Sequence, residues 1–442
     1  MGGETGQADG RTLLLSLFDA AVSAAHPEVC LPAHLPAPPP KGRLIIAGAG
    51  KAAAAMAAVA EHHYRVLGVL DRVAGFTTAP HGTAEALPGE RPRVLGIVSA
   101  RHPTPDASGV AAAERTLALV RTATADDLVL VLLSGGASAL WPAPAVGLDL
   151  EAKTALTRGL LKSGADIYEM NTVRRHISSI KGGRLRKATP ARMLTLAISD
   201  VPGDDPATIG SGPTVPDATT LEEARAVLAR RGPRMRALGF AIPAAVTSIL
   251  ADAANETPKP DDPAFASAEF RIIATPADSL AAAAREVRCF GYDVIDLGSV
   301  VTGEAREVAQ AHARLALDAK AAGRRVAILS GGELEVTVRN PQGRGGRSQE
   351  YALALAIAIA EQPGIAALAA DTDGIDGGEG LVTDPAGAVV DWRTAGGPRH
   401  ADAQNYLDNN DATTFFEAAG GLIVRGPTHT NVNDFRAILV DP

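Results

Sequence analysis

The chain has few of the residues that mark several large classes of protein. Its two cysteines, Cys30 and Cys289, lie far apart and without metal-ligand spacing, which excludes a disulfide framework and a zinc motif. No apolar run is long enough to span a bilayer. The first residues include Glu4 and Asp9 and lack a basic segment, which argues against a secretory signal. We therefore expect a soluble protein of a reducing cytoplasm.

Aromatic residues and positive charge are also scarce. Phe, Trp and Tyr together make up 4% of the 442 residues, and the formal net charge is -8. Both values argue against nucleic acid as a partner, because stacking platforms and a basic surface are missing. Hydrophobic residues at 46% and charged residues at 21% are typical of a folded globular chain, and the length predicts two or three domains. Local clusters of Lys and Arg then indicate sites for small anions.

The first such cluster is the turn Gly48-Ala-Gly50-Lys51, between an expected strand at 43–47 and an alanine-rich helix. A strand, a glycine turn and a helix N-terminus together form a phosphate-binding element. A dinucleotide fold would also need an acidic residue at the end of a strand about 20 residues later, but Asp71 opens a strand instead. A Walker A loop would be longer, with Ser or Thr after the lysine. We expect Lys51 to contact a phosphate or a carboxylate.

Two further turns in the first half have similar chemistry. An expected strand at 128–133 ends on Ser134-Gly135-Gly136, whose N–H groups suit an oxyanion or carboxylate. Before it, His102 lies in a loop that two prolines make rigid. Its side chain either donates a hydrogen bond to a substrate or only stabilises the turn.

A cationic helical face follows, with Lys181 seven positions after Arg174. Such a face is often only solvated, but in an acidic protein this density of positive charge favours an anionic partner. An expected strand at 193–199 then leads to Asp200, a candidate metal ligand or base, and to a Gly/Ser loop with Ser211.

Residues 257–263 are rich in proline, and we interpret them as an interdomain linker. Strands and helices alternate on both sides of it, which predicts two α/β domains, 1–262 and 263–442, with the active site in the cleft between them.

The stretch from Val326 to Gly377 organises the second half. An expected strand at 326–329 ends on Ser330-Gly331-Gly332-Glu333, and a second strand is expected at 335–339. Ser348 is expected to cap a helix that begins at Gln349. Arg347 and the glycine-rich turn before it would then lie at a helix N-terminus, where an anion binds.

Acidic and amide side chains follow in two loops. Asp371, Asp373 and Asp376 lie in a glycine-spaced loop after an apolar run, and carboxylates at a strand end suit Mg2+. Asp-Gly clusters are also common in plain turns. Near the C-terminus, Asn431 and Asn433 have amides that orient a hydroxyl or a phosphate, or that simply cap a helix.

Taken in order, these phrases resemble the class II glycerate kinases, the MOFRL-containing family. The matching stretches are IIAGAGKAAAAMA, HPTPDASG, LLSGGASAL, NTVRRHISSIKGGRL, ISDVPGDDPATIGSGPT, SGGELEVTV, GRGGRSQE, DTDGIDG and GPTHTNVND. They cover nearly the whole chain, and their common order is far more specific than any one of them. The resemblance implies an N-terminal Rossmann-like parallel α/β/α sandwich and a C-terminal α/β domain with a mixed sheet. It also implies Mg2+-dependent transfer of the ATP γ-phosphate to the 2-hydroxyl of D-glycerate.

By this resemblance, the catalytic residues are Lys51, Arg347 and Asp373. The residues expected to bind substrate or nucleotide are Gly48, Gly50, His102, Ser134, Gly135, Gly136, Arg174, Lys181, Ser211, Gly331, Gly332, Glu333, Asn431 and Asn433, and those expected to hold metal are Asp200 and Asp376. The implied partners are D-glycerate and ATP, without nucleic acid or membrane, and a homodimer is compatible with them.

The chain departs from the family pattern at two positions. Ser348 stands where the family commonly has asparagine, and His429 stands where glycine is usual, which adds bulk and a titratable group beside the expected site. Two other functions are weighed against the kinase. The GAGKAA turn would also suit a nicotinamide-dependent hydroxypyruvate reductase, and a non-catalytic sensor would bind an organic acid without turnover.

Overall fold

The computed structural model describes residues 10–378 and 380–442 and forms two compact α/β units. One unit spans Cys30–Ile273, and the other combines the chain up to Val29 with Ala274–Pro442. Glu4 and Asp9, which bear on the expected absence of a signal, lie outside the described residues. The first unit contains a parallel sheet and the second a mixed sheet, as the resemblance implies.

The sheet of the first unit has six strands in the order β3-β2-β1-β4-β5-β6. They are β1 (Leu44–Ala49), β2 (Val73–Pro80), β3 (Leu95–Ala100), β4 (Leu128–Leu133), β5 (Arg192–Ile198) and β6 (Ala268–Ala274). β1 and almost all of β4 are buried, because helices cover both faces of a parallel sheet. The chain order reverses between β1 and β4, and in such sheets ligands bind beyond the carboxyl ends of the strands at this switch point.

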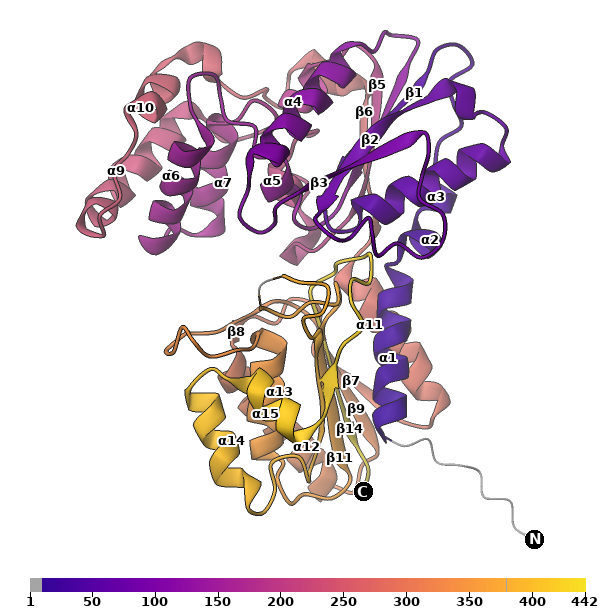
Figure 1. Ribbon diagram of the computed structural model, residues 1–442, viewed down its shortest axis with the longest axis vertical. Coiled ribbons are helices and arrows are strands. Elements are labelled where there is room, and N and C mark those ends of the chain that lie inside the picture. The colour runs from indigo at the N-terminus through magenta and orange to yellow at the C-terminus, as the bar shows by residue number, and fades with distance from the viewer. Residues whose placement is uncertain (1–9, 379) are drawn as a thin grey trace. The chain divides into compact units, whose positions relative to one another are not determined.

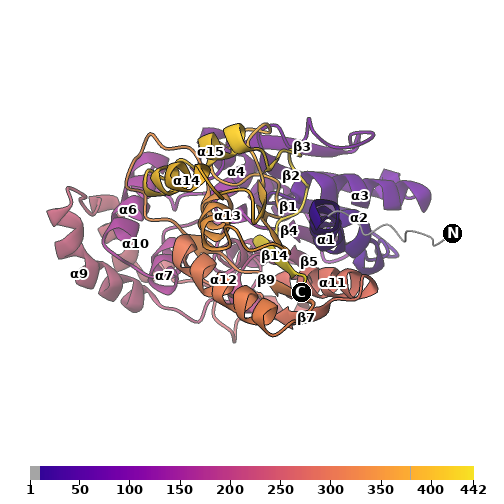
Figure 2. The same ribbon diagram turned by 90° about the horizontal axis from the view of Figure 1, so that it is seen from below.

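The helices of the first unit fall into two sets. Those near the sheet are α3 (Ala53–Val66), α4 (Ala107–Arg121), α5 (Ala137–Leu140) and α8 (Arg184–Lys187), and Figure 1 shows α3 and α4 on opposite sides of the strands. The short helix α2 (Pro27–Cys30) spans the boundary between the two units in the chain. A separate group, with its own apolar core, contains α6 (Leu150–Lys162), α7 (Ile167–His176), α9 (Leu221–Ala237) and α10 (Ala244–Ala251) (Figure 2). α7 begins at a capping box of Asp166 and Glu169, which sets where its cationic residues lie.

The sheet of the second unit runs in the order β13-β12-β11-β14-β9-β7. Its strands are β7 (Asp293–Asp296), β9 (Val326–Ser330), β11 (Ile365–Asp371), β12 (Gly387–Asp391), β13 (Leu422–Ile423) and β14 (Asp434–Val440). β7 and β9 pair in parallel, and the other neighbours are antiparallel. Alternate residues of each strand therefore pack into two different apolar cores.

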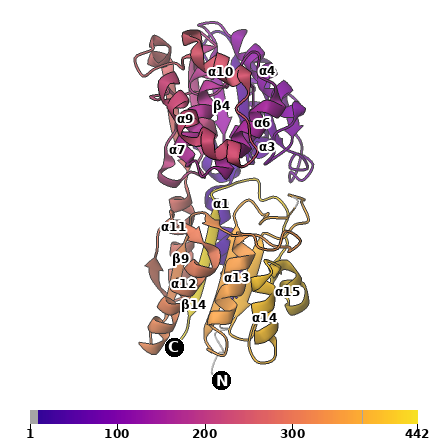
Figure 3. The ribbon, with the colours of Figure 1, turned by 90° about the vertical axis from the view of Figure 1, so that its left-hand side faces the viewer.

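Helices cover both faces of this mixed sheet. One core packs against α12 (Ala305–Ala321), α13 (Arg347–Ala358), α14 (Arg399–Asp408) and α15 (Ala412–Ala419), and the other against α1 (Gly10–Ala24) and α11 (Pro276–Cys289) (Figures 1 and 3). The shorter elements are β8 (Gly303–Glu304), β10 (Leu334–Glu335) and the 3-10 turns Pro32–His34, Leu70–Arg72, Pro202–Asp204, Ile209–Ser211, Ala253–Asn255 and Pro263–Ser267.

Two expectations from the sequence differ from this fold. The expected division into 1–262 and 263–442 misses the N-terminal helix, because Leu14, Leu17 and Phe18 of α1 pack into a core of the second unit. It also misses β6, which lies after residue 262 but joins the first sheet. Among the described helices, no single one is long and apolar enough to cross a membrane, and only the bent pair Gly10–Ala24 with Pro27–His34 passes that test by length and composition.

The strand expected at 335–339 is also much shorter, since only Leu334 and Glu335 form β10. The next N–H groups bond to side chains instead of a strand. Thr337 N donates to the carboxylate of Glu304 at 3.1 Å, and Arg339 N donates to Asn410 Oδ1 at 2.7 Å.

A buried carboxylate on α3 fixes the start of β3 and yields a stability prediction. Glu61 accepts hydrogen bonds of 2.8 Å from the backbone N–H groups of Arg93, Val94 and Leu95. Burial raises the pKa of Glu61, but these three donors outweigh it and hold the pKa below its usual value. The stabilisation is therefore complete above the ordinary glutamate pKa of about 4.3 and is lost as the pH falls through the lower folded value.

We expect Glu61→Ala to lower the unfolding free energy at pH 7 by about 1–3 kcal/mol for each buried donor that remains unpaired. Urea unfolding at pH 7 and pH 3 measures the effect, and the difference from wild type should shrink at the lower pH. Glu114→Ala, at an exposed position of α4, is the matched control. Equal stability of Glu61→Ala and wild type at pH 7 would contradict this role.

Candidate functional site

In the first unit, the glycine turns after β1 and β4 interlock at the switch point. Lys51 N donates to Gly135 O at 2.8 Å, and Ala52 N donates to Ser134 Oγ at 3.0 Å. Gly50 N bonds to Thr78 O at 3.1 Å, so β2 holds the same turn from the other side. Residues 84 positions apart in the chain, Lys51 and Gly135, thus form one structure at the carboxyl edge of the sheet.

Gly136 brings His102 and Lys51 to this structure. Gly136 has φ +84°, and a Cβ there would lie 2.9 Å from His102 Nε2 and 3.5 Å from Lys51 Cγ. Burial lowers the pKa of His102 to about 3, and the positive charge of Lys51 contributes to the shift. His102 is therefore a neutral imidazole, with one nitrogen that donates a hydrogen bond and one that accepts, while Lys51 supplies the positive charge.

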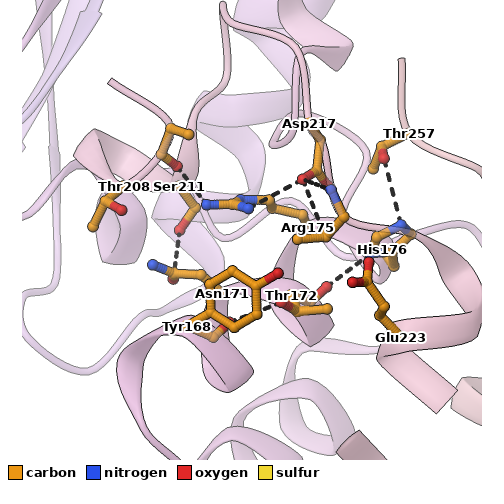
Figure 4. A network of polar contacts seen from close by, with 12 residues as sticks. Tyr168, Asn171, Thr172, Arg175, His176, Thr208, Ser211, Asp217, Glu223 and Thr257 are labelled. Atoms are coloured by element: carbon orange, nitrogen blue, oxygen red, sulfur yellow. Dashed lines mark hydrogen bonds and ion pairs between the residues drawn. The ribbon is translucent and has the colours of Figure 1, made fainter. Parts of the chain in front are cut away.

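A polar chain extends from the same turn to α7. Lys181 Nζ donates to Ser138 O at 2.9 Å and to Ser138 Oγ at 3.0 Å. The hydroxyls of Ser138 and Ser211 lie 2.9 Å apart. Ser211 Oγ in turn donates to Asn171 Oδ1 at 3.3 Å (Figure 4). Lys181 and Ser211, both predicted site residues, thus belong to one network, whereas Ser138 and Asn171 were not predicted.

Other polar residues of α7 stabilise the fold. Arg175 donates to Asp217 at 3.1 Å (Figure 4) and to Ala207 O at 2.8 Å. His176 Nε2 lies 2.9 Å from Glu256. Arg174, the residue before, is half-buried, and no described residue forms an ion pair with it. Asp200 lies two residues after the end of β5, at the same edge of the sheet as the turn after β4.

In the second unit, the predicted residues gather around Arg347, the first residue of α13. Its Nε donates to Asp434 at 2.7 Å, one terminal nitrogen to Glu333 at 2.7 Å, and the other to Asp371 at 2.8 Å. Burial alone lowers the pKa of Arg347, but the three carboxylates outweigh it and raise the pKa. The charge of Arg347 is balanced within the fold.

Sequence reasoning missed Asp434, the first residue of β14. It pairs opposite Asp371 of β11, and its second oxygen accepts from Arg436 at 3.0 Å. It also accepts from Leu334 N at 3.3 Å, which fixes the loop after β9. A lone aspartate at a strand start has no sequence signature, so only the pairing of distant strands identifies it.

The loop at residues 371–376 and the asparagine loop lie against each other. Thr428 N donates to Asp373 O at 3.0 Å, and Thr372 N donates to Asn433 O at 3.0 Å. Asp373 Oδ1 accepts from Ile375 N at 2.8 Å. Asn431 and Asn433 are buried beside these residues, and Asn433 holds a left-handed backbone with φ +65°. The structure thus brings Asp373 and both predicted asparagines together.

Gly331 and Gly332 lie where another part of the backbone of this unit comes close to them. Gly332 has φ +96°, and a Cβ there would lie 2.2 Å from Val301 O. Gly331 N donates to Gly298 O at 2.9 Å. These contacts explain both glycines without a ligand.

The structure shows a capping role for Asp376 that the sequence did not predict. Its two oxygens accept from Ser348 N at 3.0 Å and Gln349 N at 2.8 Å, at the N-terminus of α13. Ser348 is consequently not the cap, since α13 begins at Arg347 after Gly346 and the Ser348 hydroxyl is buried without a partner. Burial raises the pKa of Asp376 to about 7, and Asp434 adds to this, although the two N–H donors lower it.

We expect Asp376→Ala to destabilise the second unit by about 0.5–2 kcal/mol, because two N–H groups of α13 lose their acceptor. Thermal unfolding at pH 8 measures this loss. Asp408→Ala, at the exposed C-terminal end of α14, should leave the melting temperature within about 1 °C. A metal role would instead make the melting temperature of the wild type, but not of Asp376→Ala, rise with added Mg2+ alone.

The whole chain is similar to known proteins. The domain of unknown function DUF4147 matches residues 13–250, and the MOFRL family matches residues 326–434. A protein of Agrobacterium vitis named "Putative hydroxypyruvate reductase" is 44% identical over 438 residues, which are 97% of this chain and 94% of the relative. The D-glycerate 2-kinase of Thermotoga maritima is 35% identical over 431 residues, which are 96% of this chain and 97% of the relative.

A solved structure agrees with these sequence matches. The crystal structure of glycerate kinase from Thermotoga maritima has a TM-score of 0.81 at 33% identity, covering 97% of this chain and 99% of that one. The chain therefore belongs to the glycerate kinase family whose members join a DUF4147 domain to a MOFRL domain.

Proposed function

We propose that the protein is a glycerate 2-kinase, which transfers the γ-phosphate of ATP to the 2-hydroxyl of D-glycerate and forms 2-phosphoglycerate and ADP. The observation that carries the proposal is the pair of interlocked glycine turns that hold Lys51 at the β1/β4 switch point. Backbone N–H groups and a lysine at that place suit the phosphates of a nucleotide.

The same region argues against a nicotinamide-dependent reductase. In a dinucleotide fold, an acidic residue near the carboxyl end of the second strand binds the ribose of the cofactor. Here β2 ends on Ala79 and Pro80, and His81 and Gly82 follow it. Asp71, the only acid at a suitable spacing in the sequence, lies before β2. The acid that binds the ribose of NAD is therefore missing at the end of β2, which supports the kinase over an NAD-dependent reductase.

The proposed chemistry uses charge and position. Phosphoryl transfer proceeds with charge spread over the oxygens of the transferred group, so that fixed cations and amides supply most of the catalysis. Lys51 neutralises this charge, and neutral His102 donates a hydrogen bond beside it. Asp373 accepts the proton of the attacking hydroxyl or contributes to metal binding, and Asp200 is the alternative carboxylate for either task.

Arg347 acts under a constraint that its sequence motif does not reveal. Each of its three nitrogens already donates one N–H to a carboxylate, so a phosphoryl group competes with these acids for the guanidinium. Glu333 is the contact that gives way, because its side chain is 50% exposed whereas those of Asp371 and Asp434 are buried. Arg347 then stays anchored through the other two carboxylates while one terminal nitrogen contacts phosphate.

Mg2+ fits the donor chemistry of the acidic loop after β11. Mg2+ bound with a nucleotide needs only one or two protein carboxylates, because water and phosphate oxygens complete its shell. Asp371 and Asp373 are the carboxylates that would hold it. Among the described residues, no group of three or more His, Cys, Asp or Glu forms a separate metal site, which is compatible with an ion that arrives with ATP. When bound, the ion supplies positive charge to the phosphate oxygens.

The direct test incubates the protein with D-glycerate and MgATP and, separately, with NADH and hydroxypyruvate. We expect ADP formation that depends on D-glycerate, with phosphorus NMR showing 2-phosphoglycerate as the product. Lys51→Met should lower kcat by about 100-fold or more, because it removes a cation beside the transferred group. Lys41→Met, at an exposed position before β1, is the control. Consumption of NADH without ADP formation would overturn the proposal in favour of the reductase, and binding of D-glycerate without turnover would favour a sensor.

Arg347→Lys tests the second unit. Lysine keeps the charge but lacks the planar donors that reach three carboxylates at once, so we expect kcat to fall by about 100-fold. Arg344→Lys is the matched control from the same glycine-rich turn, since Arg344 is exposed and pairs with Glu417 at the surface. Circular dichroism and thermal unfolding show whether each variant is folded. Full activity of a folded Arg347→Lys variant would remove Arg347 from the mechanism.

A further inference from the structure

Three cationic side chains of the first unit lie together without an acidic partner. Lys153 comes from α6, Arg174 from α7, and Lys181 from the segment after α7. The lysines are 6% and 2% exposed, respectively, whereas the side chain of Arg174 is half-buried. Among the described residues, none of the three forms a salt bridge, although Arg175 next to them is paired with Asp217 at 3.1 Å.

Both lysines hold the same short segment, α5 and the two residues after it. Lys181 Nζ binds Ser138 at 2.9 and 3.0 Å, and Lys153 Nζ donates to Pro142 O at 2.6 Å. Lys153 Nζ also donates to Ile177 O at 3.1 Å, at the end of α7. All of these acceptors are neutral, so the hydrogen bonds satisfy the ammonium groups without balancing their charge.

The three charges are close enough to act on one another. Burial lowers the pKa of Lys153 to about 7, and the charge of Arg174 contributes to the shift. Burial also lowers the pKa of Lys181, with contributions from Lys153 and Arg174. These lower pKa values mean that the charged ammonium forms cost free energy in this buried place, so that both lysines lose their protons more readily than usual. An anion that bound there would relieve this cost, and Arg174, which has no hydrogen-bond partner among the described residues, is the group that can still reach it.

The surroundings favour a small hydroxy acid over a phosphate group. Neutral hydroxyl and amide groups of Ser138, Ser211 and Asn171 form a chain that starts at Lys181. Cations beside neutral donors and acceptors match a ligand that has one carboxylate and adjacent hydroxyls. α5 also follows Gly136 directly, and a Cβ at Gly136 would lie 2.9 Å from His102 Nε2 and 3.5 Å from Lys51 Cγ. A ligand held here by its carboxylate would point its hydroxyls toward the phosphate-binding turns.

We propose that Arg174, with Lys153 and Lys181 behind it, binds the carboxylate of the acceptor substrate and selects hydroxy acids over uncharged polyols. The proposal rests on the proposed kinase function, and it adds Lys153 to the residues that the sequence indicated. Arg174 contacts the ligand, and Lys153 is a positioning residue that acts through the field of the cluster and the segment it holds.

Steady-state kinetics of three variants tests the proposal. Arg174→Met should raise KM for D-glycerate by about 10- to 100-fold, because it removes charge-assisted hydrogen bonds, while KM for ATP changes less than about twofold. Arg174→Lys should restore part of the affinity. Lys153→Met should raise KM for D-glycerate by several fold. Lys162→Met is the matched control, since Lys162 is an exposed lysine on the same helix as Lys153.

The outcomes separate this inference from the kinase proposal. A rise in KM for ATP with an unchanged KM for D-glycerate would assign the cluster to nucleotide phosphates and overturn the inference. Unchanged constants in folded Arg174→Met, as judged by circular dichroism, would show a purely structural cluster and would also overturn it.

A binding assay remains informative if the wild type has no kinase activity. D-glycerate and hydroxypyruvate, but not glycerol at the same concentration, should raise the melting temperature of the wild type. They should fail to raise that of Arg174→Met. If the wild type shows these shifts in melting temperature but has no kinase activity, the kinase proposal fails and the carboxylate site stands. Equal shifts in melting temperature for the wild type and Arg174→Met would reject the site.

Discussion

The ion-pair network around Arg347 joins three strand ends of the second sheet. Glu333 follows β9, Asp371 ends β11 and Asp434 begins β14, and each binds a different nitrogen of the guanidinium. Arg436 extends the network, because it binds Asp434 and also donates to Ser330 Oγ at 3.0 Å. A buried charge must be paired to be tolerated, so each member constrains the others. The loop with Asp373 and the loop with the two asparagines are thereby held at the same edge of the sheet.

The first unit handles buried charge differently. Its sheet places Lys51 and the glycine turns at the switch point, and the buried Lys153 and Lys181 and the half-buried Arg174 have no acidic partner among the described residues. The carboxylates around Arg347 join loops of the second unit, whereas no described acidic residue forms a salt bridge with Lys153, Lys181 or Arg174, although Arg175 nearby is paired with Asp217.

The family includes proteins with two kinds of name, and the geometry of the first unit bears on the choice between them. The relative from Agrobacterium vitis has a reductase name, and the relative from Thermotoga maritima is a kinase. A phosphate cradle is common to both functions. The end of β2 bears on this choice, because an acid there binds the ribose of NAD and this chain has Pro80 and His81 instead. The kinase interpretation therefore depends on a position outside the glycine motif itself.

The sequence by itself determined the elements whose signals are local. Apolar runs that end on glycine identified β1, β4 and β9, and the glycine turns around Lys51 and Ser134 followed from the same pattern. The order of the motifs identified the family. The sequence did not predict interactions between distant residues. Asp376 takes the capping role expected of Ser348, and Asn410 and Glu304 bind the N–H groups of an expected strand. The helix α1 packs with residues of β14. The partners of Arg347 and the grouping of Lys153 with Lys181 were likewise decided by the tertiary structure, because hydrogen bonds and charges depend on distance in space rather than along the chain.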